Sequence, residues 1–136
     1  MKLTEEQIKE INEECRRLNC DDQGVFLEPW CIPNNIKEHV LYSRYMTGWM
    51  PGSCWDDEDT VNEYHECDCY DRFKVLELVL QKLNIEPSFG LMSDIQCLIV
   101  DMDDSESGYY GDYSDYKVEY IILSELYEVI DKFNNK

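Results

Sequence analysis

The sequence predicts an α+β fold, with an antiparallel sheet of about four strands covered by three helices in the order α-β-β-α-β-β-α. Some stretches carry apolar residues at helical spacing, and others are rich in β-branched and aromatic residues. The length of 136 residues suits one domain, and no repeat or linker divides the chain. We therefore expect a single domain over residues 1–136, with two acidic loops at about 47–68 and 103–115.

The first predicted helix begins at Thr4, which can form a capping box with Gln7 while Leu3 packs on Ile8. Apolar residues then recur at the spacing of one helix face: Ile8, Ile11, Cys15 and Leu18. We expect this helix to end within residues 19–24.

Two predicted strands follow, Val25–Ile32 and Ile36–Met46, and the residues Pro33-Asn34-Asn35 between them favour a turn. β-branched and aromatic side chains support both strands. Because proline cannot donate a hydrogen bond to a neighbouring strand, Pro29 implies an edge position or a bulge.

Helical spacing returns between about Cys69 and Asn84, with a predicted buried stripe of Phe73, Leu76, Leu80 and Leu83. The apolar run Ile95–Met102 is typical of a central strand, and Tyr116–Leu123 is its expected partner.

The strand Tyr116–Leu123 alternates between apolar and charged residues. Its side chains at Val118, Tyr120 and Ile122 should face the core, while Lys117 and Glu119 face outward. Ser124 should cap the last helix, whose inward residues would be Leu126, Val129, Ile130 and Phe133.

The chain is strongly acidic, with 30 Asp and Glu against 12 Lys and Arg and a formal net charge of −18. Phosphates would be repelled, so this charge argues against nucleic acid as a direct ligand and against anionic membranes. No apolar stretch has the length of about 18 residues that spans a membrane. An aromatic content of 12% nevertheless indicates a folded chain.

Cysteine is frequent, but its number, seven, is odd. The first residues, Met1-Lys2-Leu3-Thr4, lead directly into a charged helix and do not resemble a secretory signal. We therefore expect reduced thiols and a cytoplasmic location.

Two segments combine acids with aromatics and hold no Lys or Arg: residues 56–71 with eight acids and residues 101–116 with six. Carboxylates supply an attractive field, and tyrosine and tryptophan supply rigid contact area. We expect these segments to dock on a basic protein surface, such as a nucleic-acid-binding cleft, with no base to offset their charge. The candidate partner-binding residues are Trp55, Asp56, Asp57, Glu58, Asp59, Asp103, Asp104, Glu106, Tyr109, Tyr110, Asp112, Tyr113 and Asp115. The alternative is two solvated loops that keep the protein soluble.

A second alternative is a small zinc-binding protein, because thiolates and imidazole suit tetrahedral zinc. The candidate ligands are Cys54, His65, Cys67 and Cys69, although their spacing is not that of a familiar zinc finger. A thiol–imidazole pair of His65 with Cys54 or Cys67 is the one catalytic arrangement that we considered. No oxyanion-hole motif or phosphate-binding glycine loop accompanies it, so we do not expect an enzyme or an obligatory cofactor.

The segment Gly48-Trp49-Met50-Pro51-Gly52-Ser53-Cys54-Trp55-Asp56-Asp57 resembles a Gly-x-Ser-Cys-Trp-Asp motif of small phage and prophage proteins. In size and charge the chain also looks like phage-encoded anti-defence proteins, among them anti-CRISPR proteins and nucleic acid mimics. This resemblance implies an acidic inhibitor whose partner is a basic host protein, such as a nuclease or another nucleic-acid-binding enzyme.

Overall fold

The structure is a computed structural model that describes residues 2–18, 22–27, 29, 32–33, 35–50, 73–107 and 113–135. In this part of the chain, four helices accompany a four-stranded sheet. In chain order the elements are α1 (Glu5–Arg17), β1 (Gln23–Leu27), β2 (His39–Met50), α2 (Lys74–Lys82), α3 (Phe89–Gln96), β3 (Val100–Ser107), β4 (Tyr113–Ile122) and α4 (Leu123–Asn134).

The sheet is antiparallel throughout, with the strand order β1-β2-β4-β3. This confirms the predicted α+β class and the antiparallel four-stranded sheet. β2 and β4 lie at the centre, and β1 and β3 form the two edges. β1 is an edge strand, as Pro29 implied, although the strand ends at Leu27 and the proline lies outside it.

The prediction of three helices is wrong, because α3 occupies part of the predicted strand Ile95–Met102. Ser88 caps this helix by accepting a hydrogen bond from the Leu91 N–H at 3.2 Å, and Leu91 and Ile95 bury one helix face. A short apolar run does not distinguish a buried strand from a buried helix by periodicity. β3 therefore begins only at Val100, and it is an edge strand rather than a central one.

Several predicted boundaries also move. β1 is Gln23–Leu27 instead of Val25–Ile32, and β2 is His39–Met50 instead of Ile36–Met46. The predicted cap Ser124 lies inside α4, where its hydroxyl donates to Glu38.

The two longer predicted helices are present, and part of each predicted stripe is buried: Ile11 and Cys15 in α1, and Leu76, Leu80 and Leu83 in or just after α2. α2 also buries Val75, Leu78 and Val79, which the predicted stripe did not include. In α1 the capping box of Thr4 and Gln7 is present, which confirms the predicted start. α2 starts at Lys74, whereas the residues predicted before Phe73 lie outside the described part. It ends with Asn84 in the left-handed region at φ 57°, a common way to terminate a helix.

Each face of the sheet contributes to a separate apolar cluster. On one face, Leu41 and Ile121 lie beneath the helices, which contribute Ile11, Cys15, Val75, Val79, Leu80, Leu91, Ile95, Leu126 and Ile130. On the other face, Ile32 covers a cluster of Val40, Tyr42, Val118 and Tyr120. Val118 and Tyr120 thus face a core, as predicted, but the neighbouring Ile121 is buried on the opposite face.

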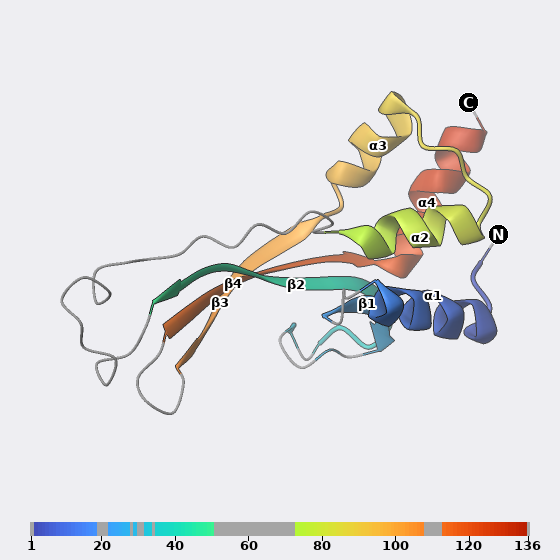
Figure 1. Cartoon of the computed structure of the whole chain (residues 1–136). Helices are drawn as coiled ribbons and strands as arrows, with labels where there is room; N and C mark the ends of the chain where they lie inside the picture. Colours follow the sequence, from blue (N-terminus) through green and yellow to red (C-terminus); the bar gives the residue numbers. More distant parts are fainter. Residues whose placement is uncertain are drawn as a thin grey trace.

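Figure 1 shows the helices gathered at one end of the sheet, while the far ends of β2, β3 and β4 extend beyond them. Among the described elements, only β4 packs against β3. The far half of the sheet is therefore a projecting arm. It is here called the distal arm and consists of β3 (Val100–Ser107), residues 113–120 of β4 and residues 42–50 of β2.

Candidate functional site

The distal arm holds the described members of the predicted binding surface. Asp103, Asp104 and Glu106 lie on β3, and Tyr113 and Asp115 lie on β4. The predicted loop 103–115 is thus largely a β-hairpin, and Thr47 to Met50 of the other predicted loop belong to β2. Outside the described residues lie Trp55, Asp56, Asp57, Glu58, Asp59, Tyr109, Tyr110 and Asp112.

Lys117 of β4 bridges two carboxylates of β3. These side chains lie on the same face of the sheet as the helices. The Nζ of Lys117 lies 3.5 Å from Asp101 Oδ1 and 3.4 Å from Asp103 Oδ1. The charge of Asp101, followed by that of Asp103, raises the pKa of Lys117. The two acidic side chains remain 53% and 91% exposed, so one ammonium only partly offsets them.

Asp101 is a member of this surface that the candidate list from the sequence did not include. The available signal was its spacing, because residues two apart on a strand share one face. Asp101 and Asp103 therefore point to the same side as soon as this segment is assigned to a strand.

On the opposite face of the distal arm, Arg44 of β2 reaches across to Asp104 of β3. The Arg44 Nε lies 3.2 Å from Asp104 Oδ2, and its guanidinium carbon lies 3.6 Å from the centre of the Tyr116 ring. The Arg44 side chain is only 9% exposed. This contact holds Asp104 in the arm, whereas the carboxylates of Asp101 and Asp103 are exposed.

The expectation that no base offsets the second acidic segment is therefore wrong in the folded chain. The segment itself contains no Lys or Arg, but the sheet brings Lys117 of the adjacent β4 and Arg44 of β2, one strand further away, to its carboxylates.

The two edges of the sheet differ in how their backbone groups are satisfied. At the β1 edge, the side-chain amide of Asn12 in α1 bonds both backbone groups of Val25. The Val25 N–H donates to Asn12 Oδ1 at 2.7 Å, and Asn12 Nδ2 donates to the Val25 carbonyl at 3.1 Å. Gly24 permits this close approach, since a Cβ there would lie 2.6 Å from Asn12 Oδ1. α1 thus closes the β1 edge at Val25.

The pairing registers show which backbone groups point outward at the opposite edge, β3. In an antiparallel strand, the N–H and C=O of one residue point to the same side, and the next residue points to the other. The backbone groups of Val25 point away from β2, so those of its partner Leu41 point toward β4. Leu41 pairs with Ile121, whose backbone groups therefore point toward β2. By alternation along β4, the backbone groups of Val118 point toward β3. Val118 pairs with Met102, which therefore points inward.

It follows that the backbone groups of Asp101, Asp103 and Ser105 point outward from β3. The Ser105 N–H bonds the carboxylate of its neighbour Asp104 at 2.9 Å, which agrees with this orientation. For Asp101 and Asp103, no described residue bonds the outward backbone groups. The β3 edge is thus open at the two residues whose carboxylates are also exposed.

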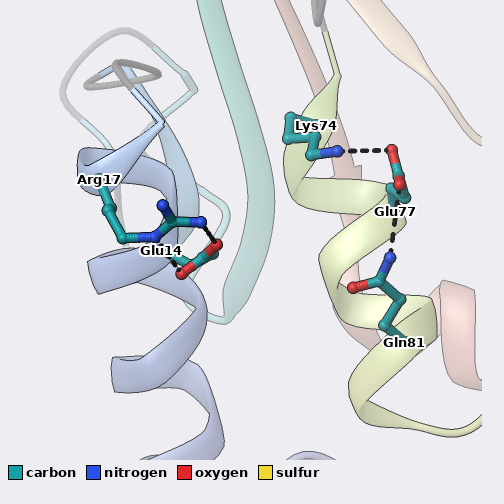
Figure 2. Close-up of polar contacts among 5 residues, drawn as sticks. All are labelled: Glu14, Arg17, Lys74, Glu77 and Gln81. Atoms are coloured by element: carbon teal, nitrogen blue, oxygen red, sulfur yellow. Dashed lines mark hydrogen bonds and ion pairs between the residues drawn. The ribbon is translucent and has the colours of Figure 1, made fainter.

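A groove of about 590 Å³ between α1 and α2 is a second feature of the surface. Among its lining side chains, Arg17 bonds Glu14 and Lys82 bonds Glu10. Beside the groove on α2, Lys74 bonds Glu77, which also accepts from the lining residue Gln81 (Figure 2). The hydrogen bond from Arg17 lowers the pKa of Glu14. These contacts make the groove close to neutral, in contrast to the distal arm.

The proposed zinc ligands Cys54, His65, Cys67 and Cys69 lie outside the described residues. Within the described ranges, no three His, Cys, Asp or Glu side chains form a group that could hold a metal ion. In that same part of the chain, no helix is both long and apolar enough to cross a membrane.

No protein-family model, curated protein or solved structure matches this chain. The resemblance to phage anti-defence proteins therefore stays a prediction.

Proposed function

We propose that this protein binds a basic surface of another protein through its distal arm and inhibits that partner by occupying its nucleic-acid-binding site. The supporting observation is the pair Asp101 and Asp103, which are exposed together at the edge of a projecting hairpin. The partner would be a basic host protein in the cytoplasm, in keeping with the phage-like sequence style.

The mechanism that we propose is electrostatic and steric, without a chemical step. A net charge of −18 would attract a basic partner from a distance and speed association. The hairpin would then fill the site that nucleic acid otherwise enters. Because such steering acts between exposed charges, it is screened over about 8–10 Å near physiological salt.

The test uses immobilised protein to capture basic partners from host lysate, followed by elution with double-stranded DNA. DNA should displace a true partner because both ligands would occupy the same basic surface. The association rate of the purified partner should fall steeply between about 50 and 500 mM salt.

The decisive variant is Asp101→Asn with Asp103→Asn, which removes two charges from the arm and keeps the size of the side chains. Its matched control, Glu128→Gln with Asp131→Asn, removes two exposed charges from α4. We expect about tenfold weaker binding for the arm variant and less than a twofold change for the control. Equal binding by both variants, or a partner that DNA does not displace, would contradict the proposal.

A further inference from the structure

The open edge of β3 suggests how a partner would be held, a step beyond electrostatic attraction. We propose that β3 binds an extended basic segment of the partner as an additional antiparallel strand, paired through the outward backbone groups of Asp101 and Asp103. This inference rests on the proposed function, because it specifies the chemistry of the partner at the same surface.

The first argument comes from the backbone. Adding a strand to a sheet requires outward N–H and C=O groups that nothing else satisfies. Asn12 occupies those of Val25 at the β1 edge, whereas no described residue bonds those of Asp101 and Asp103. In the described part of the chain, β3 therefore offers two successive outward-pointing residues for an added strand, whereas the middle of β1 is occupied at Val25.

The second argument comes from charge, and it decides the occupant. If a second copy of the chain paired its own β3 around a twofold axis at Met102, each Asp101 would lie opposite an Asp103, and four carboxylates would share one face. Like charges directly opposite each other on neighbouring strands are destabilising, and charged edge strands are a common protection against self-pairing. A strand with basic residues at those positions is instead attracted.

The third argument is the contact that the protein already makes on the inner side. There, Lys117 of β4 lies opposite Asp103 in the ladder and reaches both Asp103 and Asp101. A partner strand would place Lys or Arg beside the same two carboxylates from the outer side.

These positions define a sequence pattern for the partner. Strand residues two apart are about 6.8 Å apart, so basic residues at alternate positions match Asp101 and Asp103. The residue between them falls on the opposite face, beside Met102. The two flanking residues fall on that same face, one beside the half-exposed Val100 and one beside Asp104, whose charge Arg44 offsets. The expected pattern is therefore apolar-basic-apolar-basic-apolar.

A synthetic peptide, Thr-Val-Lys-Val-Lys-Val-Thr, tests this pattern on the intact protein by NMR titration at low salt. In the proposed register, the backbone N–H groups of both lysines point toward β3, and those of the valines point away. Two further peptides carry two backbone N-methyl groups each, either on the lysines or on two of the valines. All three peptides keep the same side chains and the same two lysine charges.

We expect N-methylation at the lysines to weaken binding about tenfold or more, because two hydrogen bonds are lost. N-methylation at the valines should change the affinity by less than about threefold. The amide signals of Asp101 and Asp103 should shift with the unmodified peptide.

Equal binding of all three peptides would overturn strand addition and leave electrostatic docking on a basic partner intact. Binding by none of them, or loss with the valine-methylated peptide, would also overturn the inference. The proposed function fails separately, if DNA does not displace the captured partner.

Discussion

The two edge strands of the sheet differ in how their outward backbone N–H and C=O groups are bonded. At β1, the side chain of Asn12 satisfies both outward backbone groups of Val25, and α1 covers the strand. At β3, the outward groups of Asp101 and Asp103 have no bonding partner among the described residues, and their carboxylates are exposed. The β1 edge is thus bonded at Val25 by a side-chain amide, whereas the β3 edge carries exposed carboxylates that repel a second copy.

This difference separates stability from binding within one sheet. Contacts at the β1 edge are partly or fully buried, so their loss should lower the free energy of unfolding. Charges at the β3 edge face water, where ion pairs contribute little to folding but can select a partner. Variants at the two edges should therefore change different measurements.

The largest expected effect on stability is that of Asn12→Ala. It leaves the N–H and C=O of Val25 without their partner in a buried strand. We expect the free energy of unfolding to fall by about 2–6 kcal/mol, because each of the two groups left without a partner costs about 1–3 kcal/mol. Urea denaturation measures this change, with Lys9→Ala on the exposed face of α1 as a control expected within about 0.5 kcal/mol. A loss no larger than that of the control would show that water replaces Asn12 at no cost.

A smaller loss is expected from Gly24→Ala, because the added Cβ would lie 2.5 Å from Phe26 Cζ and 2.6 Å from Asn12 Oδ1. Overpacking of this kind costs about 1–3 kcal/mol. The matched control is Gly90→Ala in α3, where the nearest atom would be Phe133 Cε2 at 3.4 Å. Because alanine is the better helix former by about 1 kcal/mol, this control should be neutral or stabilising. Equal losses in thermal unfolding would contradict the close approach at β1.

Parts of both edges could be predicted from the sequence, and the reasons for the misses are physical. The capping box of Thr4 and the apolar stripe of α1 are local patterns, and both were predicted correctly. The contact of Arg44 with Asp104 joins residues 60 positions apart, so the base-free appearance of the acidic segment was misleading. The end of α3 was assigned to a strand because Ile95 and Gln96 belong to the apolar run Ile95–Met102, and a short apolar run fits either period. The apolar character of that run also placed β3 at the centre of the sheet.

The smallest expected effect is that of Lys117→Gln at the open edge. This change removes the ammonium that bridges Asp101 and Asp103, so the lysine-containing peptide should bind roughly two- to fivefold more tightly. Because the pKa of Lys117 is raised in the folded protein, its stabilising contribution is complete below its unfolded pKa of about 10.4 and disappears as the pH rises through the higher folded value. Weaker peptide binding by this variant would contradict competition between Lys117 and the partner.

Amide hydrogen exchange, followed residue by residue, tests the difference between the two edges most directly. We expect the Val25 amide to exchange slowly, since Asn12 holds it, and the amides of Asp101 and Asp103 to exchange quickly in the protein alone. Addition of the unmodified lysine peptide should slow Asp101 and Asp103 and leave Val25 unchanged. Slow exchange of Asp101 and Asp103 without any peptide would mean that the β3 edge is already paired, and it would contradict the account.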